Sequence, residues 1–154
     1  MIKKIIYLSG AMGCYDRYDS YPYTWRANFE RIIKSAEEDS DYYKTFEIFD
    51  PTMYYDYHEP THYTEKEIFR YEMRKVSESD VIVVNLKDIE KSVGTICEVV
   101  NAYNNNIPII GFVNEFIGIK NIHPWIVEMC DRVEIGTNDN DAIEKAVDYI
   151  LTYY

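Results

Sequence analysis

Five short apolar segments alternate with segments of helical periodicity along the sequence, and this alternation limits the possible folds more than any other feature. A strand followed by a helix and then by another strand forms a right-handed crossover, which pairs the two strands in parallel. The clearest strand is residues 80–86, where four consecutive residues are valine or isoleucine. Such a run is typical of a strand that is covered on both faces.

The pattern predicts an α/β fold, namely a three-layer α/β/α sandwich around a mostly parallel five-stranded sheet with a flavodoxin-like or Rossmann-like layout. The chain has 154 residues, which is enough for one domain to bury a core without disulfides or a metal ion. We therefore expect a single domain over residues 1–154. Strands are expected at residues 5–8, 46–49, 80–86, 107–113 and 132–135, and helices at about 24–38, 64–78, 93–104, 123–130 and 139–152.

The composition excludes some classes of partner and indicates the cellular compartment. The formal net charge of −11 argues against binding to nucleic acid polymers or anionic membranes, because both require clustered Lys and Arg side chains. The three cysteines and the histidines His58, His62 and His123 lack the spacing of a zinc site, so we expect no metal ion and no cofactor. An odd number of cysteines, no signal peptide and no apolar run of about 18 residues indicate a cytoplasmic protein.

Two long loops are expected at residues 9–23 and 50–63, each directly after a strand. In a parallel sheet both loops leave the carboxyl edge, which is where open α/β sheets bind ligands. Gly10 and Gly13 would allow the first loop to approach a ligand closely, with Arg17 as the nearest positive charge. A plain strand-to-helix turn is the alternative interpretation, since neither a dinucleotide fingerprint nor a Walker lysine is present.

The segment that follows strand 80–86 carries the main candidate residue, Glu98. Ser92 is a suitable N-cap for a helix, and Gly94 allows a ligand to approach the free N–H groups of the first helical turn. Glu98 lies off the expected apolar stripe of this helix, so we expect it to point into a pocket rather than into the core. The alternative is a solvated glutamate. The expected stripe consists of Ile96, Val99, Val100 and Tyr103.

A second carboxyl group, Glu72, lies four residues from both Ile68 and Val76 on the preceding helix. This spacing turns Glu72 toward the apolar face, where burial would raise its pKa and suit it to act as a general acid. Glu98, near a helix N-terminal region and hydroxyl donors, is expected to stay ionised. Two carboxyl groups with separated pKa values suit the cleavage of a glycosidic bond. A glutamate at the border of an amphipathic helix is the alternative.

With these residues in place, the chain resembles the nucleoside 2-deoxyribosyltransferase family and the related 2′-deoxynucleoside 5′-monophosphate N-glycosidases. The matching pieces are residues 6–10, Glu72 eight residues before Asp80, and residues 94–99 and 107–110, and the resemblance covers roughly residues 4–113. It implies that Glu98 attacks C1′ of the sugar to form a covalent intermediate and that the Tyr7 hydroxyl orients this carboxylate. Glu72 stands where the family has an aspartate that helps to protonate the departing base.

The resemblance leaves the form of the substrate open. At the position of Ser92, typical transferases have an aspartate that contacts the sugar, whereas the monophosphate hydrolases have a serine near the phosphate. The expected partners are a deoxynucleoside or deoxynucleotide and a nucleobase, and the family forms homo-oligomers in which a neighbouring subunit completes the site. The residues expected to bind substrate are Ser9, Gly10, Arg17, Ser92, Gly94 and Thr95.

The leading hypothesis is therefore cleavage of the N-glycosidic bond, followed by transfer to another nucleobase or by hydrolysis. Two other hypotheses remain open. One is a nucleotide-binding module that uses the same sheet edge without turnover, and the other is a flavodoxin-like domain with a different ligand.

Overall fold

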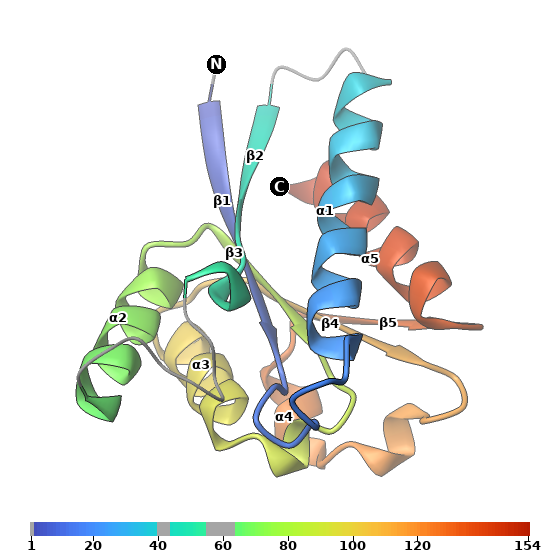
Figure 1. Ribbon diagram of the computed structural model, residues 1–154. Coiled ribbons are helices and arrows are strands. Elements are labelled where there is room, and N and C mark those ends of the chain that lie inside the picture. The colour runs from blue at the N-terminus through green and yellow to red at the C-terminus, as the bar shows by residue number, and fades with distance from the viewer. Residues whose placement is uncertain (1, 40–43, 55–63) are drawn as a thin grey trace.

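The computed structural model describes residues 2–39, 44–54 and 64–154, and its centre is one parallel sheet. Adjacent strands pair in parallel in the order β2-β1-β3-β4-β5 (Figure 1). This arrangement confirms the predicted α/β class, and the strand order is the flavodoxin-like one. The strands are β1 (Ile2–Gly10), β2 (Lys44–Phe49), β3 (Val81–Asn85), β4 (Ile109–Asn114) and β5 (Arg132–Gly136).

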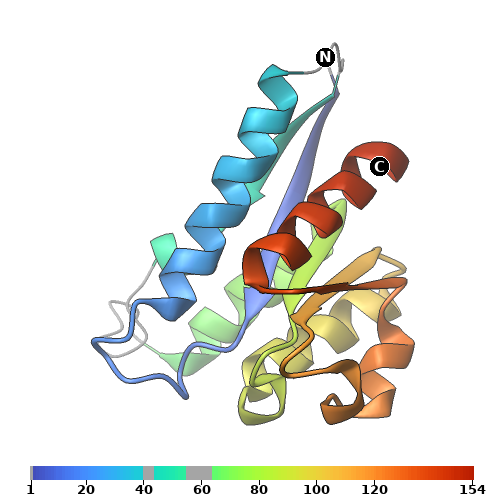
Figure 2. The ribbon, with the colours of Figure 1, turned by 90° about the vertical axis from the view of Figure 1, so that its right-hand side faces the viewer.

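Helices cover both faces of the sheet, with α1 and α5 on one face and α2 and α3 on the other (Figures 1 and 2). Within the described residues, no helix is both long enough and apolar enough to span a membrane. The α-helices are α1 (Tyr21–Glu38), α2 (Glu65–Ser77), α3 (Val93–Asn104), α4 (Pro124–Met129) and α5 (Asp139–Tyr153), and the short 3-10 turns are η1 (Pro51–Met53), η2 (Ile89–Lys91) and η3 (Ile119–Asn121).

Alternation of side chains along β1 sends neighbouring residues into different layers. Ile6 and Leu8 pack into the core beneath α1 and α5, whereas Tyr7 packs into the core beneath α2 and α3. Successive side chains of a strand point to opposite faces, so Ser9 lies on the same face as Tyr7. Two hydroxyl groups near the carboxyl end of β1 therefore face the layer that contains α3.

The strand order reverses between β1 and β3, which are neighbours in the sheet although most of the first half of the chain separates them. Their register pairs Tyr7 with Ile82 and Ser9 with Val84. Ligands of open α/β sheets bind in the crevice outside the carboxyl ends of the strands at such a reversal. Since α3 follows β3 through η2, its first turns lie at this crevice.

The first predicted loop is shorter than expected at both ends. β1 continues to Gly10, so Ser9 and Gly10 belong to the strand, and α1 already begins at Tyr21, with Pro22 in its first turn. Proline suits a first helical turn because its fixed φ is helical and its missing N–H is not needed there. In the second predicted loop, residues 55–63, with His58 and His62, lie outside the described residues.

Candidate active site

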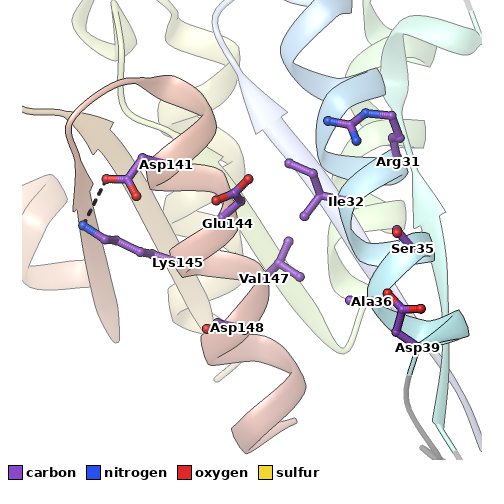
Figure 3. Close-up of a pocket in the computed structure, with 10 residues that line it drawn as sticks. All are labelled: Arg31, Ile32, Ser35, Ala36, Asp39, Asp141, Glu144, Lys145, Val147 and Asp148. Carbon is purple, nitrogen blue, oxygen red and sulfur yellow. Dashed lines mark ion pairs between the residues drawn. The ribbon is translucent and has the colours of Figure 1, made fainter.

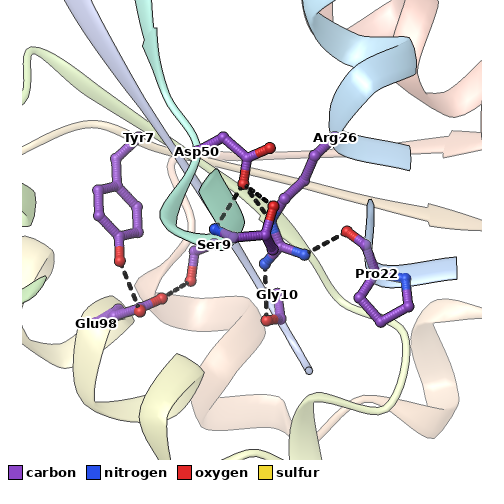
Figure 4. A network of polar contacts seen from close by, with 8 residues as sticks. Tyr7, Ser9, Gly10, Pro22, Arg26, Asp50 and Glu98 are labelled. Carbon is purple, nitrogen blue, oxygen red and sulfur yellow. Dashed lines mark hydrogen bonds and ion pairs between the residues drawn. The ribbon is translucent and has the colours of Figure 1, made fainter. Parts of the chain in front are cut away.

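A carboxylate held by two hydroxyl groups lies at the reversal of strand order. Tyr7 Oη donates a hydrogen bond to Glu98 Oε1 at 2.9 Å, and Ser9 Oγ donates one to Glu98 Oε2 (Figure 4). All three side chains are buried. The contact expected between Tyr7 and Glu98 is therefore present. Ser9 was expected to bind substrate, but in the structure its hydroxyl binds the Glu98 carboxylate.

Helix α3 is rotated relative to the expected orientation. Glu98 is only 3% exposed and lies on the inner face of the helix, whereas Val100 and Tyr103 are exposed. The expected stripe was thus wrong for these two residues, whereas Val99 is buried and Ile96 is partly buried against the core, as expected. The inner face is small and polar because it contributes to the site as well as to the core. The buried residues of α3 are Thr95, Glu98, Val99 and Ala102.

The pKa of Glu98 is raised from its ordinary value of 4.5 to about 8. Burial is the largest cause, and the charge of Glu72 raises the pKa further. The hydrogen bonds from Ser9 and Tyr7 and the charge of Arg26 act in the opposite direction without offsetting the burial. This upward direction is opposite to the expectation that Glu98 stays ionised, because two hydroxyl donors do not replace the water that the buried carboxylate has lost.

Glu72 lies on the apolar face of α2, as its spacing from Ile68 and Val76 predicted, and all three side chains are buried. Glu72 and Glu98 both line one cavity of about 350 Å³. This volume is in the range of small-ligand pockets. The cavity combines six of the predicted site residues with four others, and its lining is Gly10, Met12, Gly13, Glu72, Lys91, Ser92, Val93, Gly94, Thr95 and Glu98.

The N-terminus of α3 forms one part of this cavity. Ser92 caps the helix as predicted, since its Oγ accepts from the Thr95 N–H at 3.4 Å and lies 2.8 Å from Thr95 Oγ1. A Cβ added to Gly94 would meet nothing within 4 Å, so the backbone here is open to a ligand. Lys91, directly before the cap, pairs with Asp88 at 2.9 Å. This end of the cavity therefore combines a helix N-terminus with a lysine, which favours an anion.

Gly10 and Arg17, two of the predicted substrate-binding residues, lie in different surroundings. Gly10 lines the cavity, but a Cβ at this position would lie 2.8 Å from the Trp25 ring, so glycine is also required for the packing of α1 against β1. Arg17 is exposed and is not among the described residues that line the cavity. Lys91 therefore replaces Arg17 as the positive charge next to the predicted anion site.

Sequence analysis did not single out Arg26, which is a fully buried cation near the carboxylate. Its Nη1 donates to the Pro22 carbonyl at 2.6 Å, its Nη2 donates to the Gly10 carbonyl at 3.0 Å, and its Nε lies 3.6 Å from Asp50 Oδ1 (Figure 4). A signal was present, because Arg26 falls on the buried stripe of α1. The other members of this stripe are Pro22, Trp25, Phe29 and Ile33.

A larger cavity of about 550 Å³ lies between α1 and α5 (Figure 3). It contains none of the predicted site residues, and the Asp141–Lys145 ion pair at its rim is 3.1 Å long. We assign the chemistry to the smaller cavity because two buried carboxyl groups meet there. The residues lining the larger cavity are Arg31, Ile32, Ser35, Ala36, Asp39, Asp141, Glu144, Lys145, Val147 and Asp148.

The fold of this chain is similar to the folds of several solved structures. A conserved protein from Enterococcus faecalis V583 matches with a TM-score of 0.68 and 14% identity over 96% of this chain and 99% of that one. A 2-deoxyribosyltransferase from Bacillus psychrosaccharolyticus matches with a TM-score of 0.61 and 15% identity over 91% and 90%. A CMP N-glycosidase from Clostridium botulinum matches with a TM-score of 0.59 and 14% identity over 95% and 99%.

These similarities show that the chain shares its fold with a 2-deoxyribosyltransferase and with a CMP N-glycosidase. At the level of sequence, no protein-family model matches the chain, and no curated protein matches it. The similarity therefore lies in the fold rather than in the overall sequence.

Proposed function

We propose that this chain is an enzyme of the nucleoside 2-deoxyribosyltransferase family that cleaves the N-glycosidic bond of 2′-deoxynucleosides or their 5′-monophosphates. The observation that carries this proposal is the buried Glu98 carboxylate, which two hydroxyl groups hold in a cavity shared with Glu72. The fold that the chain shares with a deoxyribosyltransferase and an N-glycosidase supports it.

The proposed first step forms a bond between a Glu98 oxygen and C1′ while the bond from C1′ to the base nitrogen breaks. In the state that reacts, the proton held by the two carboxyl groups lies on Glu72, so that Glu98 attacks as a carboxylate. The electron pair of the broken bond goes to the base, and Glu72 donates its proton to the base. The transition state resembles an oxocarbenium ion, which the adjacent carboxylate stabilises and then traps. Each carboxylate oxygen has two lone pairs, so Glu98 can accept from Tyr7 and Ser9 and still attack the sugar.

The second step opens the ester between Glu98 and the sugar. A second nucleobase as the acceptor gives transfer, whereas water gives hydrolysis, and in both cases the proton lost by the acceptor returns to Glu72. The raised pKa of Glu98 favours the protonated side chain in the free enzyme at pH 7. The reactive form is therefore a minor one at neutral pH, and kcat/KM should rise as the pH approaches 8.

The residues at the N-terminus of α3 favour a 5′-monophosphate as the substrate. Lys91, the Ser92 hydroxyl and the open backbone at Gly94 line the same cavity as Glu98. A phosphate here would gain the charge of Lys91 and the dipole of α3. Lys91, although paired with Asp88, and the helix end would act on a phosphate at close range, whereas most of the charges that make up the net −11 are further away and screened by salt.

The test is to incubate the protein with deoxyinosine plus adenine, and separately with each deoxynucleoside 5′-monophosphate alone, and to analyse the products by chromatography. An exchanged nucleoside identifies a transferase, and a free base without an acceptor identifies a hydrolase. The matched control is Glu98→Gln, which keeps the volume of the side chain and removes the nucleophile. Binding without product in the wild type would contradict the proposal and support a nucleotide-binding module.

A further inference from the structure

Arg26 connects three segments that end at the carboxyl edge of the sheet. It donates to the Gly10 carbonyl at the end of β1 and to the Pro22 carbonyl in the first turn of α1, and it pairs with Asp50 directly after β2. Its guanidinium also lies over the Trp25 ring, 4.4 Å from the centroid. A buried arginine with this set of partners is held in one place, because each contact restricts the planar guanidinium in a different direction.

Two adjacent residues of β1 connect Arg26 to the Glu98 carboxylate. The carbonyl that accepts from Arg26 belongs to Gly10, and the preceding residue, Ser9, binds the Glu98 carboxylate through its hydroxyl group (Figure 4). A shift of the end of β1 would therefore move one of the two hydroxyl donors to Glu98. Even a small displacement of a reacting group from its productive position slows a reaction severely.

The charge of Arg26 acts on the same carboxylate. The titratable groups that act on Glu98 are Tyr7 from β1, Glu72 from α2 and Arg26 from α1, and Lys91 from η2 lines the same cavity. Glu72 and burial disfavour a charged Glu98, whereas Arg26 favours it. Asp50 partly neutralises Arg26, so it limits how strongly Arg26 can act.

We propose that Arg26 is a positioning residue for the reaction at Glu98, that it fixes the Ser9–Gly10 end of β1, and that it provides the buried positive charge under which Glu98 becomes a carboxylate. Asp50 sets the strength of this charge. The inference rests on the proposed function and adds a residue that does not line the cavity.

The experiment compares the pH dependence of kcat/KM in the wild type, Arg26→Met, Arg26→Lys and Asp50→Asn. The acid limb is the part of the profile in which kcat/KM rises with pH as Glu98 loses its proton. In Arg26→Met this limb should move to higher pH by about one unit, which lowers kcat/KM at pH 7 about tenfold. In Asp50→Asn the limb should move down. Asparagine can still accept from the Thr52 N–H, which Asp50 does at 2.9 Å, so the cap of η1 is retained.

A general loss of structure would not shift the acid limb in opposite directions in Arg26→Met and Asp50→Asn, so opposite shifts exclude it as the cause. Arg26→Lys retains the charge, so its limb should return toward that of the wild type, while kcat stays reduced because one ammonium group cannot hold both carbonyls. Arg31→Met is the matched control, since Arg31 is an exposed arginine on the same helix, and its profile should not move. Unmoved limbs in both Arg26→Met and Asp50→Asn would overturn the inference.

A second measurement does not depend on turnover. The Glu98 carboxyl carbon is titrated by ¹³C NMR in glutamate-labelled protein, with Glu98→Gln to assign the signal. The midpoint should rise in Arg26→Met and fall in Asp50→Asn. If the wild type has no glycosidic activity but the midpoints move as stated, the proposed function fails and the role of Arg26 stands. If Arg26→Met does not fold, an unmoved midpoint in Asp50→Asn overturns the inference.

Discussion

At the scale of single residues, the state of Glu98 results from opposing effects of known sign. Burial and Glu72 raise the pKa, while Tyr7, Ser9 and Arg26 lower it, and the balance lies near 8. The upward shift favours a protonated Glu98 in the free enzyme, and in the proposed mechanism Glu98 must lose this proton before it attacks the sugar.

The raised pKa of Glu98 has a consequence for stability. Between pH 4.5 and about 8 the folded state holds a proton on Glu98 that the unfolded state has already released. Stability therefore falls as the pH rises through this window, by at most about 1.4 kcal/mol per pH unit from this group, and the contribution is fully present only below pH 4.5.

We predict that the melting temperature of the wild type declines more steeply between pH 5 and pH 8 than that of Glu98→Gln. Glutamine does not titrate, and its carbonyl oxygen can still accept from Tyr7 or Ser9. Glutamine is a better replacement than alanine because Glu98 is buried, so that Glu98→Ala would leave a cavity and two buried hydroxyl groups without their acceptor. Thermal melts across the pH range provide the measurement, and parallel slopes would show that Glu98 is already ionised near its ordinary pKa.

Tyr7→Phe should slow turnover by about ten- to a hundredfold, because one of the two donors that position Glu98 is lost. The Tyr7 ring stacks on Phe49 with its centroid at 5.2 Å, and phenylalanine keeps this packing. The loss of a donor to the charged form should also move the acid limb of kcat/KM upward. Steady-state kinetics over pH measure both effects, and wild-type rates with an unchanged limb would remove Tyr7 from the mechanism.

At the scale of elements, the proposed reaction gives α3 two distinct roles. Its N-terminus forms the proposed anion site through Ser92 and Gly94, and its inner face positions Glu98 about two turns further along. The helix thus fixes the spacing between the phosphate end and the sugar end of a substrate. A change at the cap should therefore alter the choice of substrate without moving the nucleophile.

We predict that Ser92→Asp lowers kcat/KM for 5′-monophosphates by more than tenfold relative to the corresponding nucleosides. Aspartate is as good an N-cap as serine, so the helix should remain formed. Its charge would repel a phosphate, and its carboxylate could accept a hydrogen bond from a sugar hydroxyl group. The measurement is the ratio of the two kcat/KM values in both proteins. If the wild type prefers nucleosides and the ratio does not change, Ser92 serves only as a cap.

At the scale of the whole molecule, the strand order places β1 beside β3. Tyr7 and Ser9 at the end of β1 therefore reach Glu98 on α3, the helix that follows β3. The outer face of α3 is exposed beside this site and is apolar, with Val93 76% exposed, Val100 38% and Tyr103 56%. Apolar residues gathered on one helix face are typical of a contact surface.

We predict that the protein forms a homo-oligomer through this outer face of α3. Sedimentation should give a mass that is a multiple of 18.3 kDa, and Val100→Lys together with Tyr103→Lys should reduce it. Lys residues in the centre of an apolar contact would be desolvated without a partner. A wild type that sediments as a single chain at all concentrations would contradict this prediction.

Patterns along the sequence were sufficient to predict the class of fold and part of the site. Alternating strand and helix patterns lead to a parallel sheet because a helix between two strands returns the chain to the edge at which the first strand began, and the position of Glu72 followed from its spacing to Ile68 and Val76. Both inferences use contacts between residues that are close in the sequence. The strongly apolar strand 80–86 was found for the same reason.

The orientation of α3, the burial of Glu98 and the contacts of Arg26 became visible only in the folded chain. Val100 and Tyr103 are more apolar than Thr95 and Ala102, so periodicity assigned the wrong face to the core. The partners of Glu98 lie 89 and 91 residues away in the sequence. Burial, and the pKa that depends on it, follow from such distant contacts, and a local pattern does not contain them.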